Sequence, residues 1–231
     1  MREKKKHLEG TLRVLRESQK ETGKYYVEVL GRKFVVYPGV FSPKYFNDTK
    51  FFAREVHIRQ GERFLEIGPG TGVISVFAAL KGAKVVCIDI NAYAIENTKE
   101  NAKINRVKGR ITTLHGNLYD PLPKDAKFDT IFWNIPFGYV KKDKISVLEK
   151  AVFDPEYRST KSFVFGANMH LGKNGRLLIG FSTTLGHFSV LRKFLEEAGF
   201  EVKLLAQTES VETRPVKFEL FEARKNQRWA R

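Results

Sequence analysis

RFLEIGPGTG, residues 63–72, is the stretch that decides the fold of this 231-residue chain. An apolar strand runs directly into Gly68, Gly70 and Gly72, and the residues that follow are typical of a helix. Glycines at such a strand-to-helix turn allow positive φ angles and let the backbone approach a ligand closely. The dinucleotide-binding fingerprint would require glycine or alanine where Val73 stands, so this turn differs from that motif.

Predicted strands and helices alternate along the rest of the chain. The strands are expected at 63–68, 84–90, 110–117, 127–134, 175–182, 201–209 and 216–223, and the helices at 72–82, 91–105, 155–172 and 187–200. This alternation predicts an α/β protein with a doubly wound, mostly parallel, Rossmann-like sheet of seven strands. The last two strands have no helix between them, so one antiparallel strand is expected at or near an edge of the sheet.

The residues before this alternating region are expected to form a basic extension. We place the division between an extension at 1–58 and a domain at 59–231. Leucines at helical spacing predict a helix at 8–21, and two β-rich runs on either side of Leu30-Gly31-Arg32 predict a hairpin. Asp48 is expected to cap a helix that runs from Thr49 to about His57.

Composition excludes several classes of protein and favours a polyanionic partner. Lys and Arg number 41 against 26 for Asp and Glu, a net charge of +15, and basic residues are concentrated at both ends. This balance favours RNA or DNA, although a solubilising surface explains the charge equally well. No apolar run reaches the ~20 residues of a membrane span, and the charged N-terminus is unlike a secretory signal. Cys87 in an apolar run and the scattered histidines indicate a cytoplasmic protein without a metal site.

An acidic residue ends the second predicted strand of the alternating region. Asp89 follows Gly68 by 21 residues, where it can accept hydrogen bonds from both hydroxyl groups of a ribose. Together with the alternating sheet, this indicates a nucleoside-cofactor site at Glu66, Gly68, Gly70, Gly72 and Asp89. A tight turn followed by a helix-capping aspartate is the other explanation.

The pair EIGPGTG (66–72) and CIDIN (87–91) resembles the class I S-adenosylmethionine-dependent methyltransferases, over about residues 38–223. The resemblance implies that the 66–72 loop holds the methionine and ribose moieties of S-adenosylmethionine and that Asp89 binds the ribose. Asn117, after the third strand, matches the position that usually contacts the adenine. An Asx turn is an equally good explanation of Asn117.

The fourth strand of the domain ends at Asn134-Ile135-Pro136-Phe137, within FWNIPFGY (132–139). Amino-methylating members of the family carry Asn or Asp, then Pro-Pro, then an aromatic residue. The resemblance implies that the side-chain oxygen of Asn134 and the carbonyl of Ile135 accept hydrogen bonds from the acceptor nitrogen. Pro136 would hold Ile135 in an extended conformation, and Phe137 would stack on the planar acceptor.

Ile135 departs from the family pattern because it replaces the first proline. Its carbonyl remains, so the orienting hydrogen bond survives, but its N–H group now needs a partner. A strand-terminating turn in a fold that has lost its chemistry is the alternative interpretation.

The segment YPGVFSPKYFNDTKFF (37–52) resembles the residues before the cofactor loop in the small-domain methyltransferases. That group contains ribosomal RNA guanine-N2 and release-factor glutamine-N5 methyltransferases. PGVFS (38–42) and Asn-x-Pro-Phe are more similar to the ribosomal RNA enzymes. The resemblance implies that the segment folds over the cofactor, with Thr49 at its carboxylate, unless Asp48 and Thr49 only begin a helix.

The sequence as a whole predicts a cytoplasmic N-methyltransferase that uses S-adenosylmethionine and acts on an exocyclic amino group of RNA, with ribosomal RNA favoured. The basic N-terminal region and Lys141, Lys142 and Lys144 are expected to border the mouth of its site. A protein glutamine N5-methyltransferase is the first alternative. A catalytically weak RNA-binding subunit with the same fold is the second.

Overall fold

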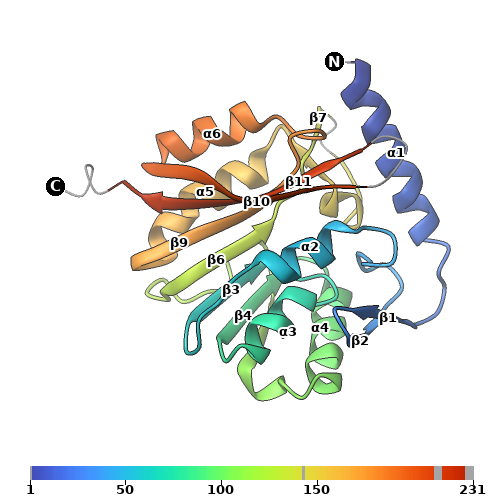
Figure 1. Ribbon diagram of the computed structural model, residues 1–231, viewed down its shortest axis with the longest axis horizontal. Coiled ribbons are helices and arrows are strands. Elements are labelled where there is room, and N and C mark those ends of the chain that lie inside the picture. The colour runs from blue at the N-terminus through green and yellow to red at the C-terminus, as the bar shows by residue number, and fades with distance from the viewer. Residues whose placement is uncertain (1, 142–143, 211–214, 227–231) are drawn as a thin grey trace.

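The computed structural model describes residues 2–141, 144–210 and 215–226, and at residues 2–6 and 8 it describes the backbone alone. Figure 1 shows one twisted sheet with helices on both of its faces. Helix α1 (Arg2–Ser18) lies beside one end of this sheet. Within the described ranges, no helix is both long and apolar enough to cross a membrane.

Seven strands form the main sheet, in the order β10-β11-β9-β6-β3-β4-β5. Neighbouring strands are parallel from β9 to β5, and β11 is antiparallel to both β9 and β10. The prediction of a doubly wound, mostly parallel sheet with an antiparallel strand near one edge is therefore confirmed. The strands are β3 (Arg63–Ile67), β4 (Lys84–Asp89), β5 (Ile111–His115), β6 (Phe128–Asn134), β9 (Leu171–Phe181), β10 (Phe200–Glu209) and β11 (Lys217–Lys225).

Successive side chains of the central strands supply an apolar core on each face of the sheet. Leu65 and Ile131 belong to the core under α5 (Arg158–His170) and α6 (Phe188–Glu197). Phe64 and Phe132 belong to the core under α2 (Asp48–Glu55) and α3 (Val73–Leu80). Helix α4 (Ala92–Ile104) packs beside α3 and against β5. Burial on both faces explains why these strands are apolar at nearly every position.

The N-terminal helix and hairpin are both present. Helix α1 runs over 2–18 rather than 8–21, because the Lys- and Glu-rich residues before the leucines are good helix formers without an apolar period. Strands β1 (Tyr25–Val29) and β2 (Arg32–Val36) form the predicted hairpin. Its turn residues Leu30 and Gly31 have φ of 49° and 74°, the positive values that a tight two-residue hairpin turn requires.

The hairpin is fixed to the rest of the molecule by the side chain of Asn101 on α4. Asn101 Oδ1 accepts a hydrogen bond from the Val35 N–H (2.7 Å), and Nδ2 donates to the Val35 carbonyl (2.8 Å). The same Nδ2 donates to the carbonyl of Thr71 in the glycine turn (2.8 Å). One buried amide therefore connects the hairpin to that turn. The division of the chain into an extension at 1–58 and a domain at 59–231 stays a prediction.

The chain after Asn134 forms structure that no sequence pattern indicated. Strands β7 (Gly138–Val140) and β8 (Phe153–Pro155) pair in parallel outside the main sheet. Leu15 of α1 packs with Val152 and Phe153 in a small apolar cluster. Helix α1 and the β7–β8 region therefore lie together, at the carboxyl ends of the parallel strands (Figure 1).

Candidate functional site

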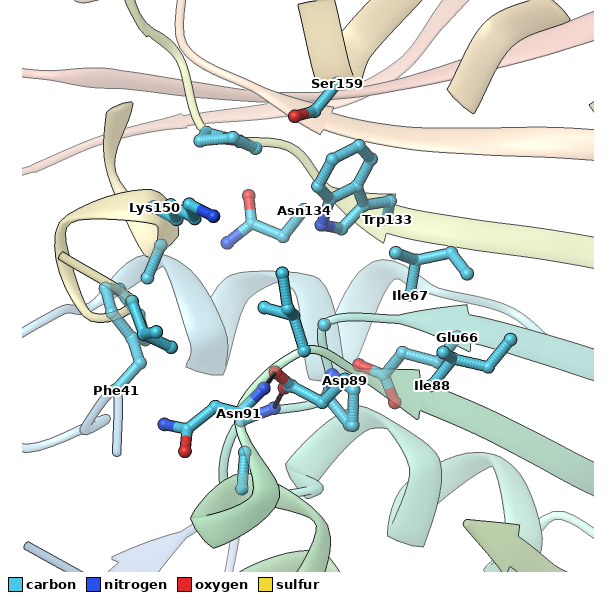
Figure 2. Close-up of a pocket in the computed structure, with 18 of the residues that line it drawn as sticks. Phe41, Glu66, Ile67, Ile88, Asp89, Asn91, Trp133, Asn134, Lys150 and Ser159 are labelled. Carbon is cyan, nitrogen blue, oxygen red and sulfur yellow. Dashed lines mark hydrogen bonds between the residues drawn. The ribbon is translucent and has the colours of Figure 1, made fainter. Parts of the chain in front are cut away.

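A pocket of about 330 Å³ opens at the carboxyl ends of the central parallel strands. Doubly wound sheets bind their ligands at this edge. Figure 2 shows Asp89 and Asn134 on opposite walls of the pocket. Eight predicted site residues line it: Thr49, Glu66, Gly68, Gly70, Asp89, Asn117, Asn134 and Pro136. Three others, Gly72, Ile135 and Phe137, lie outside its lining.

The glycine turn between β3 and α3 has a left-handed backbone at all three glycines. The φ angles of Gly68, Gly70 and Gly72 are 62°, 56° and 76°. A Cβ atom on Gly68 would lie 3.1 Å from Nε1 of Trp133, and one on Gly72 would lie 2.7 Å from Cγ2 of Thr98. Gly68 and Gly70 face the pocket, whereas Gly72 directly precedes α3 and packs on α4. Gly72 therefore shapes the turn from behind the pocket.

Asp89 is buried at the end of β4, where its carboxylate holds the rim of the pocket together. Oδ2 accepts from the backbone N–H of Gly70 (3.1 Å), and Oδ1 accepts from that of Asn91 (2.8 Å). Burial raises the pKa of the Asp89 carboxyl, and these two donors oppose the rise. Helix α4 is capped by Asn91, whose side chain accepts from the Tyr93 N–H. Each oxygen of Asp89 keeps a lone pair that can accept a hydrogen bond from a hydroxyl group.

Glu66 is a buried carboxyl group that also lines the pocket. The hydroxyl group of Ser75 donates a hydrogen bond to its Oε2. Burial raises the pKa of the Glu66 carboxyl to about 7, so the group is only partly ionised at neutral pH. A cation bound in the pocket would favour the ionised form.

We expect the Glu66→Gln variant to gain stability relative to the wild type as the pH rises from 4.5 to about 7. Over this range the unfolded chain has lost the Glu66 proton while the folded protein keeps it. The free energy of unfolding of the wild type therefore falls by at most about 1.4 kcal/mol per pH unit and levels off above this range. Glutamine has no such proton. Urea unfolding of both proteins across this range measures the difference, and parallel stability curves would contradict the assignment.

Asn117 and Thr49 line the same pocket. The backbone carbonyl of Asn117 accepts a hydrogen bond from the Asp120 N–H (3.0 Å), and this bond closes the turn that contains Asn117. The side chain of Asn117 is exposed and is not needed for that turn. Thr49 is half-buried near the start of α2, and its N–H donates to Oδ1 of Asp48 (2.8 Å). The positions of Asn117 and Thr49 thus allow contact with a ligand.

Asn134 ends β6 with its side-chain amide in a fixed orientation. Nδ2 donates a hydrogen bond to Oδ2 of Asp48 at 2.8 Å. Among the described residues, Oδ1 of Asn134 is the single buried side-chain nitrogen or oxygen atom without a hydrogen-bond partner. Leaving such an atom unpaired costs about 1–3 kcal/mol, so the unpaired oxygen calls for a functional explanation.

Asp48 is a site residue that sequence reasoning assigned to a different role. The prediction that it caps a helix is wrong: Asn47 occupies the capping position without a side-chain cap, and Asp48 is the first residue of α2. Its carboxylate is buried and binds Asn134 instead. Burial raises the pKa of the Asp48 carboxyl, and the hydrogen bonds from Asn134 and the Thr49 N–H oppose the rise. The only sequence signal was its place before an apolar helix, which is also the signal for a cap.

The turn after Asn134 is held at both ends without a second proline. The N–H of Ile135 donates to the Gly180 carbonyl on β9 (3.2 Å), so the group that a proline would lack has a partner. The hydroxyl group of Tyr157 donates to the carbonyl of Phe137 (2.8 Å). Pro136, between them, faces the pocket. The replacement of proline by Ile135 therefore leaves no buried N–H unpaired in this turn.

Phe137 lies in a different place from the one its predicted role requires. Its side chain is 7% exposed and packs edge-on against Phe181, with ring centroids 6.0 Å apart, and against Phe218 at 6.3 Å. The ring belongs to the core on the α5–α6 face and does not line the pocket. In this conformation it cannot stack on an acceptor, and we do not propose that role.

One wall of the pocket comes from residues 147–159, none of which the sequence analysis assigned to the site. Residues 147–154 carry no predicted element, and a short helical turn and the start of the three-residue strand β8 lie there, whereas Arg158 and Ser159 begin α5. The place of this stretch in the chain, between the Asn134 turn and α5, was the one signal available. The lining residues from this wall include Val147, Leu148, Lys150, Phe153, Arg158 and Ser159.

Comparison with known protein families matches residues 31–209 to the methyltransferase small domain. A candidate protein N5-glutamine methyltransferase of Methanocaldococcus jannaschii is 32% identical over 186 residues, which are 78% of this chain and 91% of that protein. The release factor glutamine methyltransferase of Aquifex aeolicus is 31% identical over 193 residues, 77% of this chain and 66% of that protein.

A similar solved structure is the 16S rRNA N2 methyltransferase of T. thermophilus in complex with AdoMet and guanosine. It aligns with a TM-score of 0.63 and 20% identity over 88% of this chain and 50% of that one, a likeness of fold. The resemblance to class I S-adenosylmethionine-dependent methyltransferases, small-domain group, is thereby confirmed. The chain belongs to the methyltransferase small domain family and is a methyltransferase of the class I, S-adenosylmethionine-dependent fold.

Proposed function

We propose that the protein transfers a methyl group from S-adenosylmethionine to an exocyclic amino group of RNA, ribosomal RNA in particular, in the cytoplasm. The observation that carries the reaction class is the unpartnered Oδ1 of Asn134, beside the pocket that Gly68, Gly70 and Asp89 also line. Methyl transfer to nitrogen requires a hydrogen-bond acceptor for an amino group next to a cradle for a nucleoside, and Asn134 and the glycine turn would supply these two parts.

The chemistry of the pocket fits the cofactor. The left-handed Gly68 and Gly70 expose backbone at the pocket, Asp89 has lone pairs for ribose hydroxyl groups, and Glu66 suits an ammonium group. Thr49 and Asn117 line the same pocket, and we assign them to the carboxylate and the adenine. When bound, S-adenosylmethionine supplies a methyl group that its positively charged sulfur activates for displacement.

Asn134 and Ile135 orient the acceptor nitrogen. The lone pair of an amino group on a planar base is delocalised into the ring, which makes the nitrogen a weak nucleophile. In this proposal one N–H group donates to Asn134 Oδ1, which orients the lone pair toward the methyl group, and the second donates to the carbonyl of the adjacent Ile135, a residue that lies outside the pocket lining in this structure. Correct positioning supplies most of the rate enhancement in such a displacement, so no general base is required.

RNA is favoured as the acceptor by the charge around the pocket. Lys150 lines the pocket, and Lys141 and Lys144 are exposed nearby in the chain, whereas Lys142 lies outside the described residues. The apolar cluster of Leu15 with Val152 and Phe153 brings the basic helix α1 to the same region. With a net charge of +15, this convergence suits a phosphate backbone.

Binding of unpaired RNA is expected to weaken with salt, because each contacted phosphate releases counterions. The logarithm of the association constant should fall with the logarithm of salt concentration, with a slope of about −0.7 per contacted phosphate. The Lys144→Ala/Lys150→Ala variant should have a shallower slope. Its matched control is Lys124→Ala/Lys173→Ala, two exposed lysines near the opposite ends of the strands. Filter binding across salt measures all three proteins, and a salt-independent affinity would contradict an RNA acceptor.

A glutamine side chain of a protein is the second candidate acceptor. The specific observation in its favour is the identity to the candidate glutamine methyltransferase, which extends over 91% of that protein. An amide nitrogen is planar and delocalised like a base amino group, so Asn134 and Ile135 would orient both in the same way.

Methyl transfer into a lysate separates these candidates. Radioactive methyl groups from S-adenosylmethionine are transferred into a lysate of cells that lack the protein, and the product is treated with ribonuclease or protease. Label released by ribonuclease alone supports RNA, and label released by protease alone moves the acceptor to protein. No incorporation in either fraction would support a catalytically weak binding subunit.

A further inference from the structure

The carboxylate of Asp48 is buried beside Asn134 with both of its oxygen atoms engaged. Oδ1 accepts from the backbone N–H of Thr49 and Oδ2 from Nδ2 of Asn134, both at 2.8 Å. Its side chain is 3% exposed and does not line the pocket, so Asp48 cannot touch a substrate. Whatever it does for the reaction, it does through Asn134.

The Asn134 amide has two possible orientations, which exchange its oxygen and nitrogen. Both carboxylate oxygens of Asp48 accept hydrogen bonds, so this side chain pairs with the NH₂ group of the Asn134 amide and not with its oxygen. The oxygen then lies on the side of Gly180, where a Cβ atom would come within 2.8 Å of it. Asp48 binds the nitrogen of the Asn134 amide, and Gly180, which has no side chain, leaves room for the oxygen. Both neighbours therefore favour the same orientation of the amide.

We propose that Asp48 is a positioning residue that selects the orientation of the Asn134 amide, so that Oδ1, which is buried and unpaired in this structure, is left to accept the N–H of the methyl acceptor when the acceptor binds. This inference rests on the proposed amino methylation. It gives a reason for the unpaired oxygen: the fold engages the donor end of the amide and leaves the acceptor end for the substrate.

The Asp48→Asn variant tests this because it has nearly the same shape but one fewer acceptor. The Thr49 N–H, at the start of α2, needs an oxygen from this side chain. The oxygen of the introduced amide should accept the hydrogen bond from the Thr49 N–H, and its NH₂ group should then point toward Asn134. The Asn134 amide is expected to rotate so that its Oδ1 accepts a hydrogen bond from this NH₂ group. The catalytic oxygen would be consumed within the protein, and the turnover number should fall by about 10²-fold.

The reciprocal exchange should restore activity. In the double variant Asp48→Asn/Asn134→Asp, the introduced NH₂ group donates to one carboxylate oxygen at position 134, and the second oxygen is left for the acceptor. The turnover number should be at least about tenfold above that of Asp48→Asn. The single variant Asn134→Asp places two carboxylates in contact and should be less active than the double variant at neutral pH. Calorimetric affinity for S-adenosylmethionine should stay the same in all four proteins.

An NMR measurement of the side-chain amide separates this inference from the proposed function. In wild-type protein with isotope-labelled asparagine, one Asn134 amide proton should be shifted downfield and exchange slowly with solvent, and this signal should be lost in Asp48→Asn. Two ordinary, rapidly exchanging protons in the wild type would overturn the inference, even if the variant does not fold. Wild-type turnover in Asp48→Asn, or a double variant no better than it, would also overturn it. A wild type with the shifted proton but no methyl transfer would overturn the proposed function alone.

Discussion

The Asn134→Ala variant is expected to turn over about 10²- to 10³-fold more slowly than the wild type, the usual loss when one preorganised hydrogen-bonding group is removed from an active site. The affinity for S-adenosylmethionine should be nearly unchanged. The amide nitrogen is engaged with Asp48, so the oxygen is the part left for the acceptor. Alanine removes that oxygen and leaves the glycine turn and Asp89 in place.

Single-turnover methyl transfer and calorimetric titration of the cofactor measure the two quantities separately. Asn168→Ala is the matched control, because it removes an amide that donates to the Ala198 carbonyl between α5 and α6, away from the pocket. That control should keep the wild-type rate. An unchanged rate in Asn134→Ala, or a variant that is unfolded, would reduce Asn134 to the residue that ends a strand.

The Asp89→Ala variant should lose about 2–3 kcal/mol of binding free energy for S-adenosylmethionine, the value of charge-assisted hydrogen bonds to the ribose, which is a loss in affinity of about 30- to 150-fold. A second effect acts in the same direction. The backbone N–H groups of Gly70 and Asn91 lose the carboxylate that they bind, so the rim of the pocket is less well ordered before the ligand arrives.

Calorimetry of the wild type, Asp89→Ala and Asp125→Ala measures this loss. Asp125 is an exposed carboxylate in the turn before β6 and should leave the affinity unchanged. Failure of the wild type to bind millimolar S-adenosylmethionine, or tighter binding of NAD, would reject the cofactor assignment.

The glycine turn and the order of elements were predictable because their signals are local. Gly68 and Gly70 adopt left-handed conformations that residues with a side chain rarely adopt, so the glycines in the sequence indicate the shape of the backbone there. Asp89 follows at the end of the next strand, and parallel strands bring their carboxyl ends to one edge. The residues near one another in the pocket could thus be inferred without knowledge of distant contacts.

Asp48 and Phe137 were not predictable, because tertiary contacts decide their roles. Asp48 meets Asn134 across 86 positions of sequence, and a carboxylate at the start of a helix is ordinarily a cap. An aromatic residue after a proline turn can face either a ligand or the core. Phe137 packs into the core on the α5–α6 face, against Phe181 and Phe218, which are distant from it in the chain.

Strand β11 lies between β9 and β10 but leaves the ribosome after both. During synthesis β10 has no neighbour to pair with, since β11 is its partner in the sheet, and β9 has an open edge on that side. A nascent chain that has not reached residue 217 therefore exposes strand edges that can pair with other chains. Closure of the sheet therefore waits for residues 217–225, and a chain terminated before them is a candidate for aggregation rather than a smaller working enzyme.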